Sequence, residues 1–142
     1  MDASADPHDL QRFVAAQQPV YGAVVEELAR GAKRSHRMWF VFPQLAGLGR
    51  SATARHYGIA SEAEARAYWR HPLLGPRLKE CTALVLAVEG KSALQILGAP
   101  DDSKFRSSMT LFEWVAPNEP AFGRALVKYF GGVRDGATLG LL

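Results

Sequence analysis

Cysteine is almost absent from this chain: Cys81 is the only one in 142 residues. A single cysteine excludes an internal disulfide and any zinc site built from several cysteines, and it is typical of a reducing compartment. Histidine is also sparse, with four scattered residues. His56 and His71 have no histidine or carboxylate at metal-ligand spacing, so we expect neither a metal ion nor another cofactor. Because Cys81 falls on an apolar stripe, we expect a core residue rather than a reactive thiol.

Long apolar runs are absent as well. The run Met38–Phe42 has five large apolar residues, whereas a helix needs roughly 20 residues to cross a bilayer, so we expect buried core and no membrane partner. Residues 1–6 are acidic and lack both the basic start and the apolar stretch of a signal peptide. We therefore expect a cytoplasmic protein in which these first residues are flexible.

The chain lacks low-complexity sequence and a strong excess of one charge. A net charge of +3, with 22% charged and 48% hydrophobic residues, is typical of a globular protein. A chain of this length buries roughly two thirds of its unfolded surface, so residues 1–142 are expected to form one domain. The basic residues gather only at Arg30, Lys33, Arg34 and Arg37. These residues form either the solvated end of a helix or a positive patch that binds an anionic partner.

Strand-like alternation is nearly absent, and helix signals fill its place. The clearest period, spaced four, three, four and three, predicts a buried seam on a helix over 76–89; it comprises Leu74, Leu78, Cys81, Val85 and Val88. Caps and prolines predict further helices that begin near Pro7, Pro19, Ser51, Ser61, Ser92, Pro100 and Asn118. We expect a mainly α fold, a single compact domain of about eight helices, several of them short.

Two local features carry narrower expectations. Met38–Phe42 has the β-branched and aromatic content of a strand, but one strand without a partner leaves its backbone groups unpaired. A buried helical turn or two is therefore expected there. Gly58 is expected to end the helix that begins at Ser51 through a left-handed turn.

The ends of the Met38–Phe42 run carry the first candidate site residues. His36 precedes the run and is the best general acid or base, because histidine titrates near neutrality. The neighbouring cations favour its neutral form, as a base requires. Trp39 and Gln44 are predicted to complete this wall of a pocket. The structural alternative is a histidine that caps a helix.

A second polar stretch follows Pro100. At 100° per residue, one face of the predicted helix carries Asp102, Ser103, Arg106, Thr110 and Glu113. Helix starts and arginines bind phosphates and carboxylates well, so a second pocket wall is predicted from Asp102, Lys104, Arg106, Ser107 and Thr110. The alternative is a surface ion pair between Asp102 and Arg106, worth only about 0.3 to 0.5 kcal/mol.

One motif matches in form only. Residues 47–52, Gly-Leu-Gly-Arg-Ser-Ala, have the spacing of a dinucleotide-binding fingerprint. That fingerprint requires a strand directly before it and a second strand with a terminal acid after it, and both are missing. We therefore expect no Rossmann-type turn here.

Several stretches together resemble a known family. They include Arg12-Phe13-Val14, Ser35-His36, Met38-Trp39-Phe40, Phe42-Pro43-Gln44, Tyr57-Gly58-Ile59, His71-Pro72, Pro100-Asp101-Asp102, Arg106-Ser107-Ser108-Met109-Thr110 and Lys128-Tyr129-Phe130. Over essentially its whole length the chain resembles the small bacterial proteins known as domain of unknown function 1810. The resemblance implies a mainly helical single domain without an established activity, and nothing here supports the calpastatin label of some members. The family usually has Trp where this chain has Arg37.

These observations lead to one main hypothesis and two alternatives. The main hypothesis is a pocket for an anionic, nucleotide-like small molecule, lined by the residues named above. Whether the protein is an enzyme stays open; a reaction there would be metal-free acid-base hydrolysis or group transfer with His36 or Asp102 as base. The first alternative is a non-enzymatic protein-interaction module. The weaker alternative is nucleic-acid binding through Arg30–Arg37, since no helix combines a basic face with interleaved aromatics.

Overall fold

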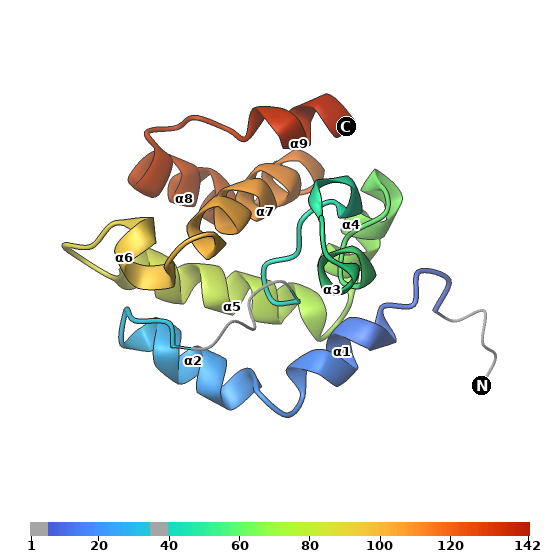
Figure 1. Cartoon of the computed structure of the whole chain (residues 1–142), viewed down its shortest axis with the longest axis horizontal. Helices are drawn as coiled ribbons and strands as arrows, with labels where there is room; N and C mark the ends of the chain where they lie inside the picture. Colours follow the sequence, from blue (N-terminus) through green and yellow to red (C-terminus); the bar gives the residue numbers. More distant parts are fainter. Residues whose placement is uncertain (1–5, 35–39) are drawn as a thin grey trace.

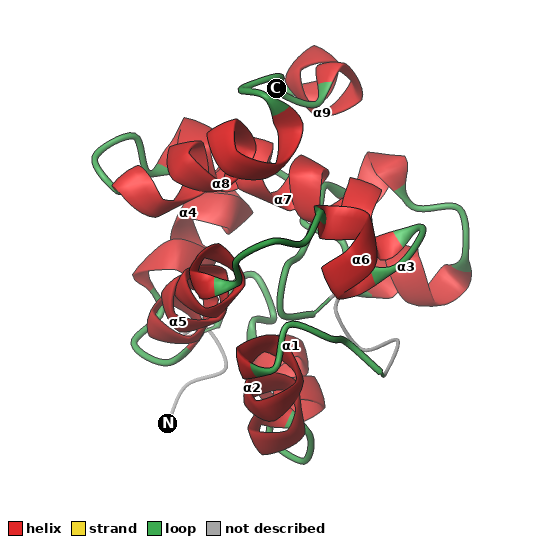
Figure 2. Ribbon diagram, turned by 90° about the vertical axis from the view of Figure 1, so that its left-hand side faces the viewer, coloured by secondary structure: helices red, strands yellow, loops and turns green. Residues whose placement is uncertain are grey.

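The fold is helical, as expected. The structure, a computed structural model, describes residues 6–34 and 40–142. Within these ranges the chain forms nine α-helices and one short 3-10 helix, with loops between them and no strand (Figures 1 and 2). They are α1 Gln11–Gln17, α2 Tyr21–Ala29, η2 Ala46–Leu48, α3 Ala52–His56, α4 Glu62–Arg70, α5 Leu74–Ala87, α6 Ala93–Leu97, α7 Asp101–Val115, α8 Pro120–Phe130 and α9 Gly136–Leu141.

Two long helices organise the core. Helix α5 packs against α2, α4 and α8, and α7 packs against α4, α6, α8 and α9 (Figure 1). Four of the five residues of the predicted seam, Leu74, Leu78, Cys81 and Val85, are fully buried on α5, whereas Val88 follows the last residue of the helix and is half-buried. No helix in the described part of the chain has both the length and the apolar character to cross a membrane.

Local signals place most helix starts. Ser51, Ser61 and Ser92 accept hydrogen bonds from the backbone N–H three residues on, at 3.0, 3.1 and 3.1 Å. Helix α5 begins two residues before Pro76, because Nδ1 of His71 accepts from the N–H groups of Leu73 and Leu74 at 3.1 and 3.2 Å. These caps satisfy donors that a helix start leaves unpaired.

The sequence reasoning missed α9, the last helix, which lies beyond α7 and α8 at the upper edge of both views (Figures 1 and 2). Its cap is Asp135, whose carboxylate accepts from the N–H of Thr138 at 2.9 Å. The backbone N–H of Asp135 in turn donates to Oγ1 of Thr110 on α7 at 2.9 Å. A contact across 25 residues therefore holds this helix, in addition to its local cap.

The expected helical turn at Met38–Phe42 was wrong for the residues that are described. Residues 40–42 form a turn and a bend, although Phe40, Val41 and Phe42 are buried as expected. Their backbone finds partners outside the segment. The carbonyl of Phe40 accepts from Nε2 of Gln17 at 2.7 Å and from the hydroxyl of Tyr68 at 3.0 Å. Side chains of α1 and α4 thus replace the hydrogen bonds that a helix would have supplied.

A short bridge continues this segment. Ile59 donates its N–H to the carbonyl of Gln44 and accepts from the N–H of Ala46, both at 2.8 Å. Gly58 beside this bridge does not have the expected left-handed conformation. A Cβ there would lie 2.4 Å from the Cα of Ala46, so the close approach of two backbones explains the glycine.

Gly75 makes a similar close approach, and its replacement is testable. A Cβ at Gly75 would lie 2.1 Å from the carbonyl oxygen of Trp69, whereas a Cβ at Gly22 in α2 meets nothing within 4 Å. Gly75→Ala should therefore lower the free energy of unfolding by about 2 kcal/mol or more, because the backbone must shift. Gly22→Ala should raise it by about 0.5 to 1 kcal/mol, as usual for an unhindered helical glycine. Urea unfolding of both variants checks the pair, and equal effects would contradict the packing of α4 on α5.

Candidate functional site

The structure brings two of the predicted ligand residues together. Gln44, after the Met38–Phe42 run, and Lys104 on α7 both line a hollow of about 290 Å³. The other lining residues follow Gln44 in the sequence, from η2 to α3: Leu48, Gly49, Arg50, Ser51 and Ala54. His36, Trp39 and Arg37 lie outside the described residues, so their predicted roles remain predictions.

The backbone of this hollow is firmly held. Gln44 is buried, and its carbonyl is bonded to Ile59 at 2.8 Å. The hydroxyl of Ser51 accepts from the N–H of Ala54 at 3.0 Å, which fixes the turn into α3. The amide of Gln44 supplies one acceptor oxygen and two N–H donors.

The charge of the hollow has one sign. Among the described residues, the lining contains the cations Arg50 and Lys104 and no carboxylate. Two cations beside an amide suit an anion, because guanidinium and ammonium groups form charge-assisted hydrogen bonds with phosphate or carboxylate oxygens. Asp102, the predicted alternative base, is partly exposed in the first turn of α7 and does not line this hollow.

The remaining predicted ligand residues bind other parts of the protein. Arg106 donates from Nε to the carbonyl of Val133 at 2.9 Å and from Nη2 to that of Arg134 at 3.0 Å. The one hydroxyl hydrogen of Ser107 has two acceptors within reach, the carbonyl of Ser103 at 3.1 Å and the carboxylate of Asp135 at 3.3 Å. These contacts fasten the connection between α8 and α9 to α7.

Thr110 belongs to the same set of contacts. Its hydroxyl donates to the carbonyl of Arg106 at 2.9 Å and accepts from the N–H of Asp135 at 2.9 Å. Thr110, Ser107 and Arg106 do not line the Gln44–Lys104 hollow. Within the described ranges, no ion pair joins Asp102 to Arg106, so the surface pair considered from the sequence is not formed.

A buried ion pair that the sequence reasoning missed lies at the start of α7. Lys33, expected in a solvated basic cluster or patch, pairs instead with Asp101, and the two side chains are only 4% and 6% exposed. The backbone N–H of Lys33 donates to the carbonyl of Ile96 at 2.8 Å. The segment after α2 is therefore tied both to α6 and to α7. Because 68 positions separate the partners, no local pattern could have paired them.

A second set of buried hydrogen bonds lies after His36 in the sequence, at Phe40. The carbonyl of Phe40 accepts hydrogen bonds from the side chains of Gln17 and Tyr68, which are both fully buried. Nε2 of Gln17 also donates to the Tyr68 hydroxyl at 3.1 Å, and Oε1 of Gln17 accepts from Arg77 at 3.3 Å. The stretch that contains His36 and Trp39 is thus bounded by Lys33 and Phe40, each held by buried polar contacts.

The side chains that could bind a metal ion, and the single thiol, were also located. Across residues 6–34 and 40–142, no group of three or more His, Cys, Asp or Glu side chains is arranged to hold a metal ion. Cys81 is buried. Its thiol lies 3.8 Å from the hydroxyl of Tyr21, and burial raises the pKa of the thiol to about 12.

Comparison with known proteins places the chain in a family. The chain belongs to the family described as "Protein of unknown function (DUF1810)", which matches residues 7–142. It is similar to the crystal structure of the conserved hypothetical protein Rv1873 from Mycobacterium tuberculosis, at 58% identity and a TM-score of 0.95, over 96% of this chain and 98% of that one. No curated protein matches the chain. The expected family is confirmed, and it brings no activity with it.

The contribution of the Lys33–Asp101 pair to stability can be tested by substitution. Lys33→Met should lower the free energy of unfolding by about 3 to 5 kcal/mol, because it leaves the Asp101 carboxylate buried without its partner. The double variant Lys33→Met/Asp101→Leu removes both charges and should be more stable than Lys33→Met alone.

The control for this experiment is the exposed pair of Arg66 with Glu62, whose side chains are 43% and 39% exposed. Arg66→Met should change the free energy of unfolding by less than about 1 kcal/mol. Urea unfolding of the wild-type protein, Lys33→Met, Asp101→Leu, the double variant and Arg66→Met gives the comparison. Simple addition of the two single losses at Lys33 and Asp101 would show that the pair is not coupled.

The reactivity of the Cys81 thiol can be tested by alkylation. With a pKa of about 12, the thiol stays protonated at pH 8 in the folded protein and should not react with iodoacetamide. In urea the unfolded chain recovers an ordinary thiol pKa, and alkylation should proceed. Mass spectrometry of both samples measures the modified fraction. Rapid alkylation of the folded protein would mean that the thiol is accessible and activated.

Proposed function

We propose that the protein binds a small phosphorylated or otherwise anionic molecule in the Gln44–Lys104 hollow. The observation that carries the proposal is the lining itself: Arg50, Lys104 and Gln44 all line the hollow, and the described lining has no carboxylate. These residues come from two parts of the chain about 60 positions apart, and only the fold unites them.

The size of the hollow limits the range of ligands that fit it. Sites for drug-sized ligands span about 300 to 1,000 Å³, and this hollow has about 290 Å³. That volume favours a sugar phosphate or one end of a nucleotide over a complete dinucleotide. The ligand would place its anionic group between Arg50 and Lys104 and a hydroxyl against the Gln44 amide, where hydrogen bonds discriminate between ligands.

Catalysis is the second and separable part of the proposal. His36 or Asp102 would act as the base in a metal-free hydrolysis or group transfer, with the cations of the hollow holding the anion. The support for this part is chemical, because histidine suits the role of a base near neutral pH.

One observation favours the alternative of a protein-interaction module. Arg106, Ser107 and Thr110, three of the predicted ligand residues, donate to carbonyls or a carboxylate of the chain itself. The concentration of polar side chains on this part of α7 is therefore explained by their role in holding the fold together. The ligand proposal consequently depends on Lys104, Arg50 and Gln44.

Substitutions at Lys104 and Arg106 separate the two readings. Lys104→Gln should weaken the binding of ribose 5-phosphate about 10-fold to 150-fold, since it removes a charge-assisted hydrogen bond. Arg106→Gln should keep the affinity and lower the free energy of unfolding by about 1 to 2 kcal/mol, because two carbonyls lose their donor. Isothermal titration and urea unfolding measure both quantities.

Lys79→Gln serves as the matched control, because Lys79 pairs with Glu119 at 2.9 Å and does not line this hollow. It removes the same charge and should leave ribose 5-phosphate affinity unchanged. If ribose 5-phosphate, AMP and pyrophosphate all fail to bind the wild-type protein at millimolar concentration, the ligand proposal fails and the interaction module gains support. Should a substrate be found, His36→Asn is expected to reduce turnover more than affinity.

A further inference from the structure

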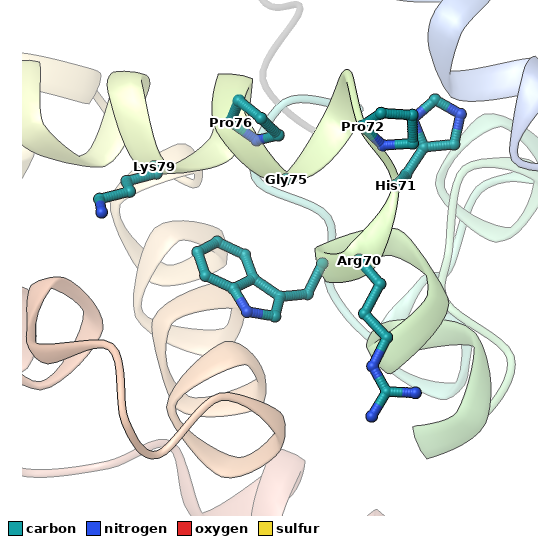
Figure 3. Close-up of a pocket in the computed structure, with 7 residues that line it drawn as sticks. Arg70, His71, Pro72, Gly75, Pro76 and Lys79 are labelled. Atoms are coloured by element: carbon teal, nitrogen blue, oxygen red, sulfur yellow. The ribbon is translucent and has the colours of Figure 1, made fainter.

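A larger hollow lies where the end of α4 meets the start of α5. It has a volume of about 400 Å³ and is lined by Trp69, Arg70, His71, Pro72, Gly75, Pro76 and Lys79 (Figure 3). An adjoining hollow of about 420 Å³ shares Trp69 and Arg70 with it. Neither has a lining residue in common with the Gln44–Lys104 hollow. This is therefore a separate place on the molecule.

The wall of this hollow is apolar and fixed in place. The half-buried indole of Trp69 packs edge to face on Phe122, with ring centroids 5.2 Å apart at 77°. Pro72 and Pro76 carry no backbone N–H, and their rings are apolar. The nearby N–H groups of Leu73 and Leu74 are already bonded to Nδ1 of His71. The wall thus suits the apolar, planar body of a ligand rather than a polar one.

Two cations flank the hollow, and their surroundings differ. Figure 3 shows the side chains of Lys79 and Arg70 extending in different directions. Lys79 donates to the carboxylate of Glu119 at 2.9 Å, and this hydrogen bond lowers the pKa of Glu119. Glu119 therefore stays ionised and balances the charge of Lys79.

Arg70 has no such balance. It is exposed at the end of α4, and among the described residues its guanidinium has no ion pair or hydrogen bond. An anionic group that enters beside Lys79 meets the negative charge of Glu119. One that enters beside Arg70 meets an unbalanced, planar cation that binds carboxylates in a bidentate manner.

We propose that this hollow binds an aromatic carboxylate, with its ring against Trp69 and the prolines and its carboxylate on Arg70. The proposal rests on the apolar wall, the volume and the charge arrangement of these residues. It is independent of ligand binding at Gln44 and Lys104.

The test uses 2-naphthoate as the probe and two-dimensional NMR of the folded protein as the readout. The indole N–H resonance of Trp69, assigned through Trp69→Phe, should shift on titration. Arg70→Gln should weaken binding about 10-fold or more, because the charge-assisted hydrogen bonds are lost. Arg30→Gln, which removes an exposed arginine at the end of α2, should have no effect.

Three further arms sharpen the result. Neutral 2-naphthylmethanol should bind about 10-fold more weakly than 2-naphthoate, because it lacks the charge. Glu119→Gln should strengthen 2-naphthoate binding a few-fold, since it removes the negative charge next to Lys79. Lys104→Gln should leave it unchanged, which separates this site from the phosphate site.

Several outcomes would overturn the proposal. One is the absence of any shift of the Trp69 indole at millimolar 2-naphthoate. Another is equal affinity in Arg70→Gln and Arg30→Gln, which would mean that the arginine does not hold the carboxylate. A third is equal binding of the alcohol and the acid, which would reduce the site to an apolar surface without selectivity for anions.

Discussion

The structure depends on how one irregular segment is accommodated inside a helical core. Residues 40–45 are buried but not helical, so their backbone groups need partners from elsewhere. The carbonyl of Phe40 receives two donors, Gln17 from α1 and Tyr68 from α4. An unsatisfied buried carbonyl costs about 1 to 3 kcal/mol, which is a large part of the stability of a small domain. This requirement fixes how α1 and α4 sit against the segment.

The same segment joins the aromatic core. Tyr68 packs edge to face on Phe13 at 5.1 Å and contacts Phe112 at 5.5 Å, while Phe42 packs on Phe105 at 4.9 Å. The rings therefore link the segment to α7. Once residues 40–45 lie between α1, α4 and α7, Gln44 reaches its bond with Ile59, and the chain from Gly49 to Ala54 shares a hollow with Lys104. The position of the hollow follows from the path of the segment.

Local signals in the sequence predicted most of the fold. Caps such as Ser51 and Ser92 act within three residues, and the α5 seam repeats within one helix, so both are visible without the tertiary structure. The nonlocal features were not predictable in this way. Lys33 and Asp101 are 68 positions apart, and α9 is fastened to α7 through Thr110. The turn at residues 40–42 belongs to the same group, because Gln17 and Tyr68 decide its hydrogen bonding.

The candidate site shows why residue type alone predicts function only in part. The sequence reasoning placed Lys104 and Arg106 in one predicted pocket wall, and the fold separates them: Lys104 lines a hollow, whereas Arg106 donates to carbonyls of the α8–α9 connection. A guanidinium binds a backbone carbonyl with the same N–H groups that bind a phosphate. Which of the two it does is decided by the nearest acceptor in space. Arg106 has acceptors supplied by its own chain, whereas Arg50 and Lys104 line the Gln44–Lys104 hollow, where an anionic ligand can reach them.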